Sequence, residues 1–221
     1  MNDRTGTRHR THVVAASDAA KRMLEEIASA ARSSLPAYIF GPAGSGRKHA
    51  ARAVHGLSTR ASGPFEVFSA RGTDEFRQQS ELFGSGDASR TPGAIAGARG
   101  GTLVIDDVES LSAPVRAQLI DYLKKTSENP SGPQAEQAPR IIVTSGLEPS
   151  LSDIRFAGIR LASLEERPEC TLPLAAHFLA LFAAEAGTEP IGFTADARRW
   201  LLEEPWHGNI RELGERVRQA V

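Results

Sequence analysis

The sequence predicts an α/β domain built on a parallel sheet, followed by a smaller domain that contains only helices. Short apolar strands alternate with helical segments over most of the chain, which is typical of a parallel sheet. A glycine-rich loop joins the first strand directly to a helix. After residue 164, helical segments follow one another without strands. We therefore expect an α/β domain over residues 13–164 and a helical domain over residues 165–221.

The composition narrows the class of protein. The 221 residues are 40% hydrophobic and 24% charged, which suits one globular domain with a small second one. The net charge of −1 gives no overall positive field that would attract nucleic acid or an anionic membrane. The one cysteine, Cys170, excludes an intrachain disulfide and a cysteine-built zinc site, and it favours a cytoplasmic location.

The sequence predicts neither a signal peptide nor a membrane span. Residues 1–12 include basic residues, but no apolar segment follows them, and we expect this polar stretch to be disordered. The longest apolar run, residues 172–184, is interrupted by Pro173 and His177. We therefore expect no helix that crosses a bilayer.

The predicted strands are short and apolar, as in a buried parallel sheet, and they occupy residues 37–40, 65–68, 103–105, 140–143 and 158–161. Ser17 and Ser112 are expected to cap two of the helices, and Thr73 is expected to begin another. Residues 126–139 are rich in Pro, Ser, Gly and Gln, which predicts a surface loop.

The predicted helices after the glycine loop lie at residues 47–55 and, in the helical domain, at residues 172–186, 194–203 and 210–220. Gly56 is expected to end the first of these helices. Asn209 and Glu212 are spaced like a capping box at the start of the last one.

The glycine loop is the strongest functional signal. A strand, three glycines and a helix start in this order bring backbone N–H groups around a phosphate. The usual pattern is G-x-x-x-x-G-K-[ST], but here an arginine occupies the lysine position and a lysine occupies the Ser/Thr position. A glycine-rich turn that binds nothing is the alternative. The expected ligand-binding residues are Gly41, Pro42, Ala43, Gly44, Ser45, Gly46, Arg47 and Lys48.

An acidic pair after the third strand is the second signal. Asp106 is expected to hold Mg²⁺ through water, and Asp107 is the candidate catalytic base that activates water. Two acids that only cap a surface strand are the alternative. The glycine loop upstream favours the interpretation as a nucleotide site.

These segments resemble the AAA+ domain of bacterial enhancer-binding proteins, the ATPases that remodel RNA polymerase carrying sigma-54. The resemblance covers roughly residues 13–221 and rests on motifs that occur in the family's order: the loop at 41–47, Glu-Leu-Phe-Gly at 81–84, Gly-Gly-Thr-Leu at 100–103, the acidic pair, and Pro-Trp-His-Gly-Asn-Ile-Arg-Glu-Leu at 205–213. It implies a P-loop NTPase-like parallel sheet with helices on both faces, followed by a helical lid.

The resemblance also implies roles for residues outside the loop. Arg211 corresponds to the sensor arginine of the lid, which reaches the γ-phosphate, and Val13 and Val14 correspond to the segment beside the adenine. ATP or ADP with Mg²⁺ is the implied cofactor. Trp206 is expected to lie in the lid core rather than beside the nucleotide.

The departures from the family pattern are equally informative. The Gly-Ala-Phe-Thr-Gly-Ala loop that touches the sigma factor is missing from residues 85–99, and the first sensor position holds Ser145-Gly146. The family's asparagine that restrains the catalytic acid falls at Ser69, and the shortened finger segment keeps only Arg155. Positioning and charge neutralisation are nearly the whole of phosphoryl-transfer catalysis, so we predict weak or no ATP hydrolysis.

Three functions follow from this pattern. The first is a degenerate AAA+ regulatory module that binds another protein, either an intact activator of the family or a component of the transcription machinery. An active sigma-54-interacting ATPase and a non-enzymatic sensor of an anionic ligand in the old nucleotide cleft are the alternatives. We expect no DNA-binding module, no receiver domain and no membrane association, and the sequence leaves a homo- or hetero-oligomer open.

Overall fold

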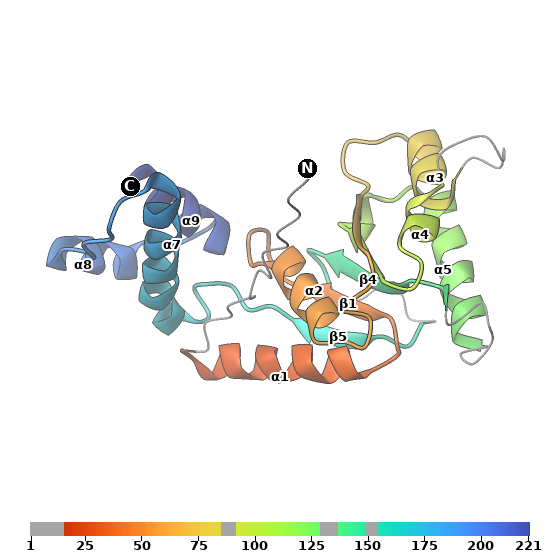
Figure 1. The fold of residues 1–221 in the computed structure, drawn as a ribbon, viewed down its shortest axis with the longest axis horizontal. Coiled ribbons are helices and arrows are strands. Elements are labelled where there is room, and N and C mark those ends of the chain that lie inside the picture. Colours follow the sequence, from red (N-terminus) through yellow and green to blue (C-terminus); the bar gives the residue numbers. More distant parts are fainter. Residues whose placement is uncertain (1–15, 85–91, 129–136, 149–153) are drawn as a thin grey trace, which may run out of the picture.

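A five-stranded parallel sheet forms the centre of the molecule in the computed structural model, which describes residues 16–84, 92–128, 137–148 and 154–221 (Figure 1). The strand order is β2-β3-β4-β1-β5. Every pair of neighbouring strands is parallel. All five predicted strands are confirmed. β1 (Ala37–Phe40) has the predicted ends, and one or two residues separate the predicted from the observed ends in β2 (Phe65–Ser69), β3 (Thr102–Asp106), β4 (Arg140–Ser145) and β5 (Ala157–Arg160).

Helices cover both faces of the sheet, as Figure 1 shows. On one face α1 (Asp18–Arg32) and α2 (Arg47–Gly56) pack against alternate strand residues, among them Ile39, Val104 and Ile142. On the other face α3 (Glu75–Phe83), α4 (Ala94–Gly97) and α5 (Ala113–Glu128) cover the remaining alternate residues, such as Tyr38, Leu103 and Val143. Burial on both faces explains why β1, β3 and β4 are almost entirely buried, whereas the edge strands β2 and β5 are partly exposed.

Of the three helix starts predicted at Ser17, Thr73 and Ser112, only the one at Ser17 has the expected side-chain cap. The Ser17 hydroxyl accepts a hydrogen bond from the Ala20 N–H at 3.1 Å. The prediction for Thr73 is wrong, because the Asp74 carboxylate caps α3 and the Thr73 hydroxyl donates to the Ala70 carbonyl instead. α5 does begin after Ser112, but the buried Ser112 hydroxyl has no hydrogen-bond partner among the described residues.

The predicted surface loop at 126–139 starts later than expected. Helix α5 continues to Glu128, and residues 129–136 of the predicted loop lie outside the described residues. The 3₁₀ turn η1 (Val108–Ser110) connects β3 to this helix.

The lid consists of the short 3₁₀ turn η2 (Pro168–Cys170) and three helices, α7 (Thr171–Ala186), α8 (Ala195–Glu203) and α9 (Asn209–Gln219). Trp206 lies in the lid core, as predicted, and its indole N–H donates to the Leu201 carbonyl at 2.9 Å. Residues 168–186 are long and apolar enough, by length and composition alone, to span a membrane. Because Leu174 and Phe182 of this stretch belong to the lid core, we interpret it as a core helix.

His55 at the end of α2 gives the fold a predictable pH dependence. Its ring is half-buried beside Phe65 and shares a hydrogen bond of 2.9 Å with the Thr102 hydroxyl. Burial, with the nearby Arg52 charge, lowers the pKa of His55 below its ordinary value of 6.5. The folded state therefore favours the neutral ring, and this contribution to stability is complete above pH 6.5 and lost as the pH falls below it.

We expect the free energy of unfolding to fall as the pH decreases below 6.5, and we expect His55→Gln to flatten that slope because glutamine keeps a polar group and does not titrate. Denaturant titrations at several pH values measure the slope. His207→Gln, at an exposed histidine, is the control. An unchanged slope in the His55 variant would contradict the assignment.

Candidate functional site

The glycine loop leaves the sheet at the end of β1, a central strand between β4 and β5, and leads into α2. Gly44 and Gly46 have φ angles of 77° and 101°, a region that side chains disfavour. A Cβ atom at Gly41 would lie 2.5 Å from the Leu161 carbonyl oxygen, so this position also requires glycine. The N–H groups in the first turn of a helix have no intrahelical partner, and in α2 no side chain caps them.

The lid is fastened to this loop by Asn209 and Arg211. The Asn209 side chain donates to the Ala43 carbonyl at 2.9 Å and accepts from the Leu164 N–H at 2.8 Å. The Arg211 backbone N–H donates to the Gly44 carbonyl at 3.3 Å. The predicted capping box is therefore wrong, because the Asn209 side chain is committed to contacts outside its own helix.

A different residue completes the start of α9. Gly208 precedes the helix, and its N–H donates to the Glu212 carboxylate at 2.8 Å. Asn209 itself has a left-handed backbone with φ of 57°, which asparagine tolerates better than most residues.

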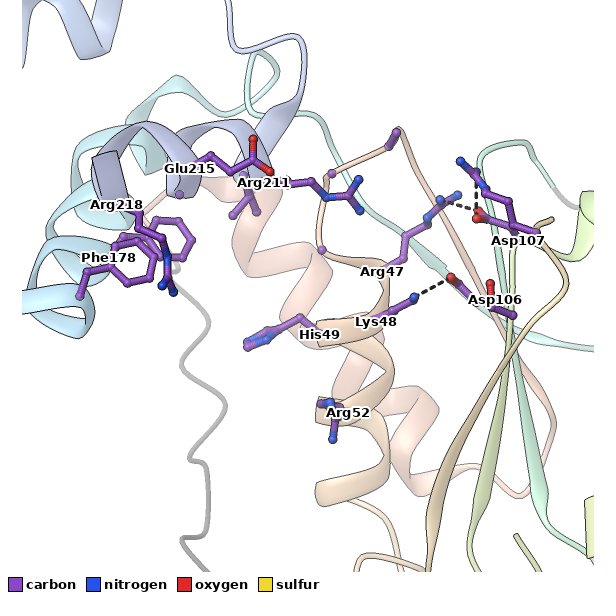
Figure 2. Close-up of a pocket in the computed structure, with 18 residues that line it drawn as sticks. Arg47, Lys48, His49, Arg52, Asp106, Asp107, Phe178, Arg211, Glu215 and Arg218 are labelled. Atoms are coloured by element: carbon purple, nitrogen blue, oxygen red, sulfur yellow. Dashed lines mark hydrogen bonds and ion pairs between the residues drawn. The ribbon is translucent and has the colours of Figure 1, made fainter. Parts of the chain in front are cut away.

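Asp106, at the end of β3, is buried and fully engaged. One carboxylate oxygen accepts from the Thr144 hydroxyl of β4 at 2.7 Å. The other oxygen pairs with the Lys48 ammonium at 2.9 Å, as the dashed line in Figure 2 marks. The carboxylate thus joins the start of α2 to the centre of the sheet.

Asp107 is held by two arginines. Its Oδ1 pairs with Arg47 Nη2 at 2.7 Å, and its Oδ2 pairs with Arg71 Nη2 at 2.9 Å. Only 7% of the Asp107 side chain is exposed, and its backbone has a left-handed φ of 55°. A guanidinium group therefore faces each carboxylate oxygen of Asp107.

Gly146, which the resemblance places at the first sensor position, contacts Glu109. The Gly146 N–H donates to the Glu109 carboxylate at 2.8 Å. A Cβ atom at Gly146 would lie 3.3 Å from that carboxylate and 3.5 Å from Arg47 Nη1. Burial opposes the charge on Glu109, but hydrogen bonds from the Gly146 N–H, its own N–H and the Ser145 hydroxyl, together with the nearby Arg47 charge, outweigh burial and lower the pKa of Glu109.

A cleft of about 710 Å³ lies between the loop, the two acids and the lid. Its volume is in the range of small-molecule sites. Eight of the predicted site residues line it together: Ala43, Gly44, Gly46, Arg47, Lys48, Asp106, Asp107 and Arg211. Arginine and lysine outnumber the acids in the lining, and Figure 2 shows Arg211 extending from the lid toward the loop that carries Arg47. The lining of the cleft therefore carries a net positive charge.

The remaining predicted residues lie elsewhere. Ser45 lines a smaller adjoining cavity of about 170 Å³, where its hydroxyl and the buried Arg167 Nε have no hydrogen-bond partner among the described residues. Burial lowers the pKa of Arg167. Gly41 and Pro42 belong to the loop but do not line either cavity. Val13 and Val14 lie outside the described residues.

Two further residues of the sequence analysis are placed by the structure. Ser69 lines the cleft at the end of β2, and Arg155 is exposed but does not line the cleft. Sequence reasoning missed Arg71, which follows β2 by two residues and reaches Asp107 because β2 and β3 are neighbours in the sheet.

The residues present do not fit the Mg²⁺ ion that the resemblance implies. Magnesium is held by oxygen ligands, and the position expected to supply a hydroxyl carries the Lys48 ammonium, which has no acceptor. That ammonium occupies the free oxygen of Asp106. A divalent cation at this place would meet like charge.

Comparison with known proteins matches both parts of the chain. The family described as Sigma-54 interaction domain matches residues 13–155, and the family described as AAA+ ATPase lid domain matches residues 165–221. The sigma54-dependent transcriptional activator SfnR of Pseudomonas putida is 29% identical over 220 residues, which cover 90% of this chain and 60% of SfnR. The transcriptional regulatory protein FlbD of Caulobacter vibrioides is 30% identical over 203 residues, which cover 83% of this chain and 45% of FlbD.

Solved structures show the same fold. NtrX from Brucella abortus in complex with ADP superposes with a TM-score of 0.79 at 26% identity, over 95% of this chain and 51% of NtrX. The complex of NtrX with ATP gives a TM-score of 0.77 over 93% of this chain. The chain thus spans about half the length of the relatives that it matches.

Proposed function

The chain belongs to the family of sigma-54 interaction domains with an AAA+ lid, and from that premise we propose that it is a degenerate regulatory module of this family. In this proposal it keeps a nucleotide-sized anion cleft, hydrolyses ATP weakly or not at all, and acts by binding another protein. The relatives are bacterial transcriptional regulators, so we propose a role in transcription regulation in the cytoplasm.

The observation that carries the proposal is the pair of arginines on Asp107. A catalytic base needs a free oxygen within hydrogen-bond reach of the proton that it takes. Here Arg47 and Arg71 occupy the two oxygens at 2.7 and 2.9 Å. If one arginine moved away, the Asp107 carboxylate, whose side chain is only 7% exposed, would lose a charged partner, and this costs free energy.

Retention of nucleotide binding has separate support. The left-handed glycines, the uncapped first turn of α2 and the basic lining of the cleft persist, and all of them favour a bound phosphate. The structural neighbour NtrX was solved with ADP and with ATP. We propose that ADP or ATP occupies the same cleft here, with Arg211 facing the phosphates.

We propose that the chain acts by binding a partner protein. The lid exposes large apolar side chains: 45% of Trp200, 54% of Leu202 and all of Ile191. We propose that the partner is an AAA+ activator of the same family or a component of the transcription machinery, in a homo- or hetero-oligomer. A pull-down with the tagged chain from lysate of the source cell tests this part. Recovery of neither kind of protein would argue against it.

We expect the turnover of Mg-ATP to stay below about 10⁻² s⁻¹, roughly 10³-fold under a median enzyme, because losing an arginine finger alone costs that much. Asp107→Ala is expected to leave this residual rate unchanged, since the acid is already engaged. A phosphate-release assay measures both rates. Turnover near 1 s⁻¹ that disappears in Asp107→Ala would show an active ATPase and overturn the proposal.

The anion-sensor alternative draws on the excess of cations in the cleft. A thermal-shift screen of nucleotides and phosphorylated metabolites separates it from the first proposal, because only a sensor would prefer a ligand without a nucleoside.

A further inference from the structure

We propose that Lys48 is a built-in cation in the place of a divalent metal, so that the cleft binds phosphate-bearing ligands without Mg²⁺. The chemical class of ligand is a nucleoside diphosphate or another diphosphate. The nucleoside part of this inference rests on the proposed function, while the metal independence rests on the ion pair itself.

The position of Lys48 is the first argument. It is the second residue of α2, whose uncapped first turn faces the cleft. Its Nζ lies 2.9 Å from Asp106 Oδ2, and the Thr144 hydroxyl fixes the other oxygen of that carboxylate at 2.7 Å. The carboxylate is therefore held in one orientation by a hydroxyl and an ammonium, and the oxygen that would face a metal already faces the Lys48 ammonium.

The geometry of the ammonium is the second argument. An ammonium has three N–H donors, and Asp106 is the one ion-pair partner of Lys48 within the described part of the chain. The side chain is 58% exposed and lines the cleft, so the other donors can reach phosphate oxygens. A group that bridges a buried carboxylate and a phosphate does what the metal would otherwise do.

Charge is the third argument. A divalent cation can enter only if Lys48 leaves Asp106, since the two would repel each other at close range. Arg47 and Arg211 line the same cleft and add to the positive charge that a phosphate meets. The protein thus supplies the neutralisation that Mg²⁺ supplies elsewhere.

Calorimetric titration of the whole chain with ADP, and separately with pyrophosphate, tests this inference in EDTA and again in millimolar MgCl₂. We expect both ligands to bind in EDTA, with an affinity that Mg²⁺ does not raise by more than about twofold. Binding of ADP that requires Mg²⁺, or that Mg²⁺ strengthens at least about tenfold, would overturn the inference while leaving the proposed nucleotide cleft intact.

The other outcomes separate the two proposals. Pyrophosphate binding in EDTA without any ADP binding would support the metal-independent site and contradict the nucleotide cleft. The absence of heat with both ligands, with and without Mg²⁺, would overturn both. All of these titrations use the wild-type chain, so no outcome depends on whether a variant folds.

Lys48→Thr sharpens the test because it removes the ammonium and restores a hydroxyl. We expect its affinity for ADP in EDTA to fall at least about tenfold and to recover partly with Mg²⁺. Lys21→Thr, at an exposed lysine of α1 paired with Asp18, is the matched control and should bind as the wild type does. Equal ADP affinity of Lys48→Thr and wild type in EDTA would contradict the role of Lys48.

Discussion

Replacing Gly44 with alanine is expected to release the lid from the glycine loop and to weaken ADP binding at least about 100-fold, or roughly 2.7 kcal/mol. A Cβ atom at this position would lie 2.0 Å from the Gly208 carbonyl oxygen, far inside van der Waals contact. The start of α9 would have to withdraw, together with Arg211, whose N–H donates to the Gly44 carbonyl. The φ angle of 77° adds strain for any residue with a side chain.

We expect the same substitution to lower the free energy of unfolding by about 1–3 kcal/mol, the usual cost of a strained backbone position. Titration calorimetry measures the affinity, and chemical denaturation measures the stability. Gly187→Ala is the matched control, because Gly187 has a φ of 68° with nothing within 4 Å of its added Cβ. If both variants lost the same stability and neither lost affinity, the contact between lid and loop would carry no function.

The strands and the glycine loop could be predicted because local sequence determines them. Strands buried on both faces read as apolar runs, and left-handed turns at Gly44 and Gly46 demand glycine. The helix caps were harder. Thr73 and Asn209 have the right residue type and spacing for caps, but their hydroxyl and amide groups found other partners once the chain had folded.

Asn209 shows why residue type and spacing alone cannot predict such contacts. Its side chain donates to the Ala43 carbonyl, which is 166 residues away in the sequence. The spacing to Glu212 is the same whether the asparagine caps its own helix or docks on the loop. Only the arrangement of lid and sheet decides between the two.

The two motifs of the site were predicted, but the ion pairs between them were not. The sequence identified the basic pair at 47–48 and the acidic pair at 106–107, but assigned the acids to metal and water. The ion pairs follow from parallel neighbours in the sheet, which bring Ser69 of β2 beside Asp106 of β3 and so place Arg71 next to Asp107. No local signal distinguishes Arg71 from any other arginine after a strand.

Replacing Arg47 with methionine is expected to destabilise the fold, which is unusual for a residue in a phosphate-binding loop. Arg47 is 12% exposed and Asp107 is 7% exposed, and removing one partner of a buried ion pair typically costs about 3–5 kcal/mol. Arg71 stays on the other oxygen and, being 71% exposed, compensates in part, so we expect a loss of about 2–4 kcal/mol. For a chain of this size that corresponds to a melting temperature lower by roughly 5–15 °C.

A double-mutant cycle with Asp107→Asn isolates the interaction, because asparagine is neutral and tolerates the left-handed backbone of this position. We expect the double variant to be more stable than the sum of the single losses predicts, by about 1–3 kcal/mol, when unfolding is followed by circular dichroism in denaturant. An arginine held ready for phosphate would give the opposite result, with unchanged stability in Arg47→Met, no coupling to Asp107 and a loss of ADP affinity alone. That result would support Asp107 as a catalytic base, because an ion pair without stabilising energy could open at no cost during catalysis.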